Sequence, residues 1–294
     1  MVKRRKFRLR LPSRTLILGE RTLLMGVLNI TPDSFSDGGK FLDPQQAIDH
    51  ALEMERGGAD LLDIGGESTR PGSTGTSLDT ELARILPVLH GLRGMLKIPI
   101  SIDTRKSEVA EAAVAAGAEI INDVSGLKND PRIAEVAARR GIPLILMHMR
   151  GEPRTMQKVP FARDVLKDVS SGLRASIAVA RKAGVRKSQI VIDPGIGFGK
   201  SFEQSYELLR KLPELAKLGY ALVVGTSRKG FLGATLAKDG KSAPPEERIW
   251  ATAATVVASI LGGAHIVRVH EVPEMAQVAR VSDFILGAPG KVRR

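Results

Sequence analysis

Eight short apolar runs, separated by helical stretches, constrain the fold of this chain more than any other feature. They are apolar throughout rather than alternating, which is typical of parallel strands buried on both faces. The runs cover residues 24–31, 61–66, 98–104, 119–126, 142–149, 190–195, 221–227 and 265–270. Several follow a glycine that is placed to end a helix, as in GGADLLDI and RRGIPLIL. Eight strand–helix units in 294 residues predict an α/β protein, a single closed (β/α)8 barrel of the TIM type.

An open doubly wound sheet is the alternative, and it would normally carry a diagnostic nucleotide loop. The string DPGIGFGKS resembles a phosphate-binding loop, but Pro194 occupies the position where the Walker spacing needs a glycine. The string also follows the sixth run rather than the first. We therefore favour the barrel.

The two ends of the chain carry most of its positive charge. The formal net charge is +12, and nine cations lie within residues 1–10 and 291–294, so that the remainder is close to neutral at +3. Residues 7–18 alternate apolar and polar side chains and predict a β-hairpin covering the barrel floor. We divide the chain into a basic, flexible tail (1–10), a barrel (11–288) and a basic carboxyl-terminal tail (289–294).

Composition excludes several classes of protein. The absence of cysteine rules out disulfides and thiolate zinc sites. No long apolar run or secretory signal is present, so we expect a cytoplasmic protein without a membrane partner. Since the charge lies in the tails, we expect no nucleic-acid partner either. An RNA-binding role for the tails remains an alternative, and it predicts binding that weakens steeply as salt rises.

Polar residues follow every apolar run, at the end of a barrel where chemistry takes place. Lys229, Arg268 and His270 follow the last two runs, where barrels commonly bind phosphate, and predict a phosphate or diphosphate site. The remaining groups suit a flat heterocycle with a guanidine-like edge, because a carboxylate accepts two parallel N–H bonds from such an edge. These groups are Asp103, Asn122 and Asp193.

Two other features have plain structural interpretations. His148 has no partner histidine at metal-ligand spacing, so we expect it to pack or to line the rim. Trp250 begins an apolar run over 249–261 that predicts a helix buried nearly all round, in the core or at a subunit interface.

With these segments placed, the chain resembles the dihydropteroate synthase family from about residue 23 to residue 287. The resemblance rests on LNITPDSFSDGG, DIGGESTRPG, ISIDT, INDVSG, DPGIGFGK, GTSRKGFLG and RVHEV, in family order. It implies a pterin-binding barrel of folate biosynthesis that joins 6-hydroxymethyl-7,8-dihydropterin diphosphate to p-aminobenzoate. The products are 7,8-dihydropteroate and diphosphate, with Mg²⁺ as cofactor and a homodimer as the expected assembly.

The resemblance also implies roles for individual residues. Those that match the family's pterin site are Asp103, Asn122, Met147, Asp193, Phe198, Gly225 and Lys229. Those that match its diphosphate site are Asn29, Thr69, Arg70, Arg268 and His270, and the amide oxygen of Asn29 would also bind Mg²⁺. Those that match its p-aminobenzoate site are Phe35, Thr69, Pro71, Lys229 and Gly230. Catalytic roles fall to Asp103, Lys229, Asp37 and Arg70.

One residue departs from the family pattern. Many members carry serine or arginine directly after Ser-Arg-Lys, where this chain has Gly230. A side-chain contact to the p-aminobenzoate carboxylate is impossible there, so we expect altered affinity rather than lost activity. The nearest rival is a pterin-binding methyltransferase domain, which shares the acid and amide residues but binds no diphosphate. Arg70, Lys229, Arg268 and His270 favour the synthase.

Overall fold

Eight parallel strands close into a barrel in the computed structural model, which describes residues 4–31, 43–69, 72–156 and 161–288. The strands are hydrogen-bonded in the order β10-β3-β4-β5-β6-β7-β8-β9. Their bounds are β3 Leu23–Asn29, β4 Leu61–Gly65, β5 Ile100–Asp103, β6 Ile120–Asp123, β7 Leu144–Met147, β8 Ile190–Asp193, β9 Ala221–Gly225 and β10 Ile266–Val269. The predicted (β/α)8 barrel is confirmed.

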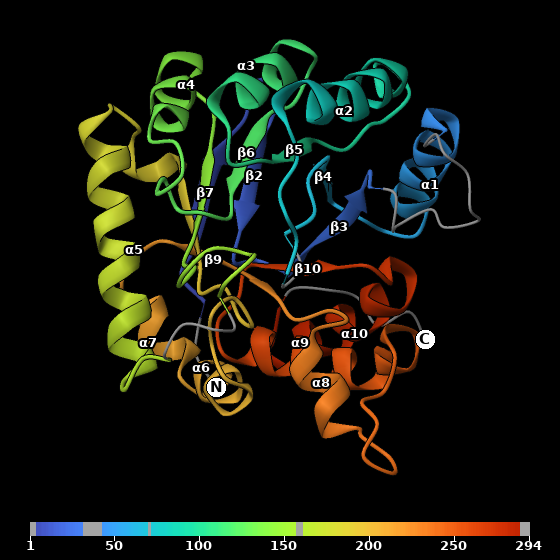
Figure 1. The fold of residues 1–294 in the computed structure, drawn as a ribbon, viewed down its shortest axis with the longest axis vertical. Helices are drawn as coiled ribbons and strands as arrows, with labels where there is room; N and C mark the ends of the chain where they lie inside the picture. Colours follow the sequence, from blue (N-terminus) through green and yellow to red (C-terminus); the bar gives the residue numbers. More distant parts are fainter. Residues whose placement is uncertain (1–3, 32–42, 70–71, 157–160, 289–294) are drawn as a thin grey trace.

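Helices follow the strands and surround them (Figure 1). The longer ones are α1 Pro44–Arg56, α2 Leu78–Leu92, α3 Ser107–Ala115, α4 Arg132–Arg140, α5 Val165–Lys182, α6 Phe202–Arg210, α9 Ile249–Leu261 and α10 Val272–Ile285. Shorter helical segments are α7 Leu212–Ala216, α8 Gly230–Thr235 and the 3-10 turns Lys187–Gln189 and Pro245–Arg248. None of the helices in these ranges is both long and apolar enough to cross a membrane.

Local sequence explains where the helices begin and end. The Asp43 side chain accepts a hydrogen bond from the Gln45 N–H, and Pro44 occupies the first turn of α1. Ser201 and Gln204 form a reciprocal capping box at the start of α6. At the other end of a helix, Gly141 adopts a φ of 68° and returns α4 directly to β7.

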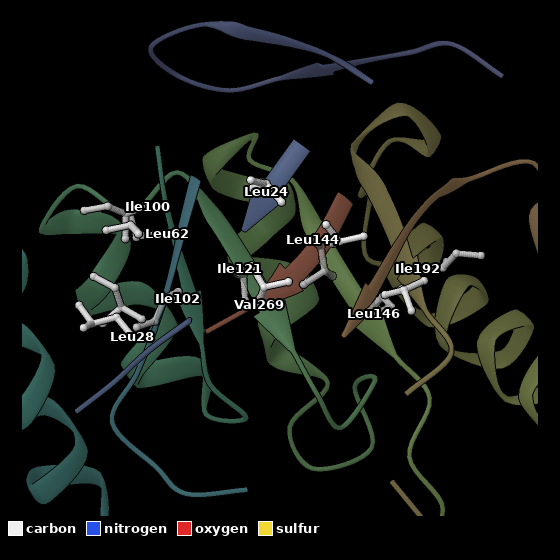
Figure 2. Packing of buried hydrophobic residues seen from close by; sticks show 14 of the residues in the cluster. Leu24, Leu28, Leu62, Ile100, Ile102, Ile121, Leu144, Leu146, Ile192 and Val269 are labelled. Carbon is white, nitrogen blue, oxygen red and sulfur yellow. The ribbon is translucent and has the colours of Figure 1, made fainter. Parts of the chain in front are cut away.

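The outward faces of the barrel strands form the larger part of the core. Leu62, Ile102 and Leu146 belong to a continuous buried cluster that also includes apolar side chains of the helices (Figure 2). Because side chains alternate along a strand, the residues between them point into the barrel. The lowest inward layer is apolar and includes Met25, Ile145 and other buried side chains.

The amino-terminal hairpin packs against this lowest layer. Strands β1 (Phe7–Arg10) and β2 (Thr15–Leu18) pair antiparallel, and Leu9 and Leu18 are buried in the same cluster as Met25. The predicted floor hairpin is therefore confirmed. The basic tail predicted for residues 1–10 is too long, because β1 begins at Phe7 and the buried Arg4 side chain forms an ion pair of 2.5 Å with Asp283.

Helix α9 forms over the predicted residues, but the Trp250 side chain is 81% exposed. The helix therefore does not lie wholly in the core, and the predicted subunit interface stays a prediction. A helix whose inner face packs on α10 and α6 need not be covered on the other side, and composition alone does not show which side stays open.

Candidate active site

The inward-facing side chains change from apolar to polar toward the carboxyl ends of the strands. Strand register places Asp103 beside Asn122, Met147 beside Asp193, and Gly225 beside Arg268. Two further inward polar residues, Asp63 and Ser101, lie opposite each other on β4 and β5. The apolar floor and the polar mouth thus lie within one barrel, and the mouth is where the sequence predicts the site.

A buried ion-pair network occupies one side of the mouth. The Arg268 Nε donates to Asp63 Oδ2 at 2.6 Å, and an Arg268 terminal nitrogen donates to Asp103 Oδ2 at 2.9 Å. Asn122 Nδ2 donates to the same Asp63 oxygen at 2.9 Å. The guanidinium is thereby shared between two carboxylates, and its planar set of donors suits this arrangement.

The acidity of Asp103 is strongly perturbed. Its pKa is raised to about 8, chiefly by burial and then by the neighbouring Asp63 carboxylate, while the Arg268 guanidinium opposes both effects. A buried carboxyl group whose pKa is shifted by burial and by specific charged neighbours is a feature of functional centres. Asp103 can therefore respond to positive charge that develops next to it.

A second pair of charges lies on the other side of the mouth. Burial raises the pKa of Asp193, whereas the Gly195 N–H, which donates to it at 2.7 Å, and the nearby Lys229 lower it. Burial and then Arg268 lower the pKa of Lys229 to about 8. The Lys229 ammonium lies 3.9 Å from the centre of the Phe198 ring, a cation–π contact.

An apolar wall completes this side of the mouth. Met147 packs in a buried cluster with Val124, Met149 and Met156, and Phe198 packs against that cluster. Flexible thioether side chains next to an aromatic ring form a surface that adapts to a flat ligand. Gly225, across from Arg268, adds no side chain, and a Cβ there would lie 3.5 Å from the Arg268 Cβ.

The loops after β7 and β8 are bound tightly to each other. A Cβ on Gly195 would lie 2.0 Å from the His148 carbonyl oxygen, so only glycine fits. The fully buried Lys200 contacts both His148 Nδ1 and the His148 carbonyl oxygen at 2.9 Å. Burial and Lys200 hold the pKa of His148 far below its usual value, so the neutral ring accepts at Nδ1. The expectation that His148 packs is confirmed, and Lys200 ties the loop that carries Phe198.

We predict a pH-dependent contribution of Lys200 to stability. Burial lowers the pKa of Lys200 from 10.5 to about 7, so between these values the unfolded chain binds a proton that the folded chain does not. The contribution of Lys200 to the free energy of unfolding therefore rises with pH between these two values. In thermal melts, the midpoint of the wild type minus that of Lys200→Met should increase from pH 7 to pH 10. A difference that stays constant with pH would contradict this prediction.

The loops after β9 and β10 are also joined. Ser227 Oγ lies 2.8 Å from His270 Nδ1 and 3.0 Å from Glu271 Oε2. Arg228, which has a φ of 59°, forms an ion pair with the same glutamate. Gly230 begins the short helix α8, and a Cβ there would meet no atom within 4 Å. These contacts fix His270 near the end of β10.

The predicted metal ligand lies at the end of β3. Asn29 Oδ1 lies 3.8 Å from the point where a Cβ would stand if Gly65 had one. Gly65 in turn lies beside Asp103 in the strand register. Among the described residues, no three histidine or acidic side chains form a metal-binding group. An amide oxygen is a hard ligand of the kind Mg²⁺ accepts, and Mg²⁺ commonly takes its other ligands from substrate phosphates and water. Asn29 fits that kind of site.

The structure brings most of the predicted residues together, with some exceptions. Thr69 is described and half-buried beyond β4. The predicted residues that lie outside the described ranges are Phe35, Asp37, Arg70 and Pro71. The sequence interpretation missed Asp63 and Lys200. Asp63 could have been found as the one acidic residue inside the apolar string LLDIG.

Comparison with known proteins agrees with this geometry. The family model described as pterin binding enzyme matches residues 25–270. A dihydropteroate synthase of Synechocystis is 50% identical over 267 residues, covering 91% of each chain. The chain belongs to the dihydropteroate synthase family. A Bacillus subtilis member is 46% identical over 271 residues, covering 92% of this chain and 91% of the relative.

Solved structures of the family have the same fold. The dihydropteroate synthase from Xanthomonas albilineans with 7,8-dihydropteroate has a TM-score of 0.85 at 38% identity, covering 96% of this chain and 100% of that one. A structure of that enzyme with 4-aminobenzoic acid has a TM-score of 0.88 at 40% identity, with 97% and 100% covered. The chain is thus an enzyme of folate synthesis, as its resemblance to the dihydropteroate synthase family implies.

Proposed function

We propose that this chain condenses 6-hydroxymethyl-7,8-dihydropterin diphosphate with p-aminobenzoate, releasing diphosphate and 7,8-dihydropteroate. The observation that carries the proposal is the polar mouth, in which buried carboxylates, an amide and two cations converge above an apolar barrel floor. Relatives named for this activity support it, as do related structures with 7,8-dihydropteroate and with 4-aminobenzoic acid.

The pterin ring binds deepest in this proposal. The Asp193 carboxylate accepts two N–H bonds from the guanidine-like edge of the ring. Asn122 and Lys229 bind its other polar edge. Met147 and Phe198 cover its faces, and Gly225 leaves room for it.

The diphosphate lies nearer the rim. Asn29, Arg268 and His270 bind its oxygens, together with Thr69 and Arg70. The Asn29 amide oxygen would hold Mg²⁺, which would supply positive charge to the leaving group when it is bound. The p-aminobenzoate site combines Lys229 and Gly230 with Phe35, Thr69 and Pro71.

The reaction proceeds with cleavage before bond formation. The methylene C–O bond breaks and its electron pair leaves with the diphosphate, whose developing charge Arg268 and Arg70 stabilise. Asp103 stabilises the resulting positive charge on the pterin. The p-aminobenzoate nitrogen then attacks the methylene carbon and loses a proton to solvent. Lys229 orients the reactants, and Asp37, outside the described residues, keeps the catalytic role that the family resemblance implies.

A coupled assay for diphosphate release tests this function. With pterin diphosphate, p-aminobenzoate and Mg²⁺, we expect release of one diphosphate per dihydropteroate formed. Release that needs no p-aminobenzoate and yields no dihydropteroate would contradict the proposal. So would transfer of a methyl group from a methylated pterin without diphosphate release, which is the methyltransferase outcome.

Gly230 provides a prediction about the second substrate. A serine side chain fits at this position, since no atom lies within 4 Å of its Cβ. Its hydroxyl would add one hydrogen bond to the p-aminobenzoate carboxylate, which is worth about 1.5–3 kcal/mol for a charged partner. We expect Gly230→Ser to lower the Michaelis constant for p-aminobenzoate roughly 10-fold. Gly230→Ala is the matched control, and identical Michaelis constants for both variants and the wild type would contradict the assignment.

We also propose that the enzyme is a homodimer that buries the outer face of α9. Trp250 is 81% exposed on that helix, and a cavity of about 540 Å³ lies between α6, α7 and α9, lined by residues that include Tyr206 and Ala258. Large exposed apolar side chains beside a hollow are typical of interfaces. Sedimentation tests this by comparing the oligomeric state of the wild type with that of Trp250→Arg. We expect a dimeric wild type and a weakened dimer in the variant, and a monomeric wild type would contradict the proposal.

A further inference from the structure

Asp63 contacts two residues of the mouth, but its own side chain is not exposed there. Its side chain is on β4, and the residue is 0% exposed, so it cannot touch a substrate. One of its oxygens, Oδ2, accepts both the Arg268 Nε at 2.6 Å and the Asn122 Nδ2 at 2.9 Å. Asp63 therefore holds two residues to which the proposed function gives substrate contacts.

The contact with Asn122 determines which end of its amide is offered to a ligand. With Nδ2 donating to Asp63, the amide oxygen is the free end. The flipped amide would place Oδ1 against a carboxylate oxygen, an acceptor facing an acceptor. Asn122 is consequently held as an acceptor for ligand N–H groups.

The contact with Arg268 determines how the guanidinium is used. Nε is engaged by Asp63 and one terminal nitrogen by Asp103, so the plane of the group is fixed by two carboxylates. These two bonds use Nε and one terminal nitrogen, and no bond of the other terminal nitrogen is seen among the described residues. A charge-assisted pair of this kind constrains orientation as well as position.

We propose that Asp63 is a positioning residue for pterin diphosphate, which it affects only through the Asn122 amide and the Arg268 guanidinium. The proposal rests on the substrate roles given to these two residues under the proposed function. It predicts a defect in binding pterin diphosphate that p-aminobenzoate does not share.

The Asp63→Asn variant tests this proposal with little change of shape. Asparagine retains one acceptor for the two donors but removes the negative charge that holds the guanidinium. Its new N–H₂ group takes the place of Asp63 Oδ1, which has no hydrogen-bond partner among the described residues, so this change breaks no hydrogen bond of that atom.

We expect the Michaelis constant for pterin diphosphate to rise about 10-fold to 100-fold, the range for a lost charged hydrogen bond. The Michaelis constant for p-aminobenzoate should stay within twofold. Ser101→Ala, which alters the same buried layer without touching Asn122 or Arg268, should leave both values unchanged. Calorimetric titration with inorganic diphosphate and with 6-hydroxymethylpterin should show that both fragments bind Asp63→Asn more weakly.

Two further variants exclude a merely structural effect. Adding Asn122→Ala to Asp63→Asn should weaken 6-hydroxymethylpterin binding no more than Asn122→Ala does alone, because both act on one contact. If Asp63→Asn does not fold, Asp63→Glu retains the charge but displaces the carboxylate, and should show the same selective rise. A wild-type Michaelis constant for pterin diphosphate in a folded variant overturns the proposal. Absence of diphosphate release by the wild type would instead overturn the proposed function.

Discussion

Asp193→Ala is expected to abolish pterin binding, with an affinity loss of at least about 100-fold. Two charge-assisted hydrogen bonds are lost at once, and each is worth about 1.5–3 kcal/mol. The Asp193 side chain is buried, so water does not replace these bonds freely. Isothermal titration with 6-hydroxymethylpterin measures the effect. Wild-type affinity in the variant would show that the pterin edge binds elsewhere.

Asp130 provides the matched control for Asp193. Both residues are 7% exposed, but the Asp130 carboxylate is occupied by the Ser107 N–H and by Arg132, neither of which is a proposed substrate contact. Asp130→Asn should therefore bind the pterin with wild-type affinity. Burial also raises the pKa of Asp193, so its carboxylate takes up a proton at a higher pH than an ordinary aspartate does. As pH is lowered, the affinity of the wild type for the pterin should therefore begin to fall at a higher pH as well.

Arg268→Ala is expected to reduce both activity and stability. The proposed contact with the leaving diphosphate is lost, and removal of one such donor typically lowers kcat by about 10²–10³-fold. The variant also leaves Asp63 and Asp103 without the cation they share, and breaking a buried pair costs about 3–5 kcal/mol of folding free energy. Denaturant unfolding and steady-state kinetics measure the two effects separately.

The loss of stability in Arg268→Ala should depend on pH. The pKa of Asp103 is about 8 while Arg268 opposes the effect of burial, so removing the guanidinium should raise that pKa further and make the folded variant bind its extra proton to a higher pH. The stability of the variant should therefore continue to fall above pH 8, where that of the wild type levels off. Adding Asp103→Asn should recover part of the stability but none of the activity. A double variant no more stable than Arg268→Ala would contradict this explanation.

The sequence predicted the barrel because its determinants are local. Apolar runs, caps such as Asp43 and Ser201, and glycines at helix ends each report the structure within a few residues. The site was equally predictable in outline, since polar residues at the carboxyl end of a barrel strand must reach the same rim. Asp103, Asn122, Asp193 and Arg268 are all of this kind.

The parts that sequence interpretation missed depend on contacts between distant segments. Asp63 lies in the middle of β4 rather than at its carboxyl end, and its role appears only when β10 and β6 bring their side chains to it. Lys200 lies in a string that resembles a phosphate loop, but its partner is His148, which is 52 positions away in the chain.

A crystal structure with pterin diphosphate, p-aminobenzoate and Mg²⁺ tests the central claim most directly. We predict the pterin edge on Asp193 and Asn122, and the diphosphate on Arg268, His270 and the Mg²⁺ bound by Asn29. The p-aminobenzoate nitrogen should face the pterin methylene. A pterin bound outside the barrel mouth, or a diphosphate without contact to Arg268 and His270, would contradict the account.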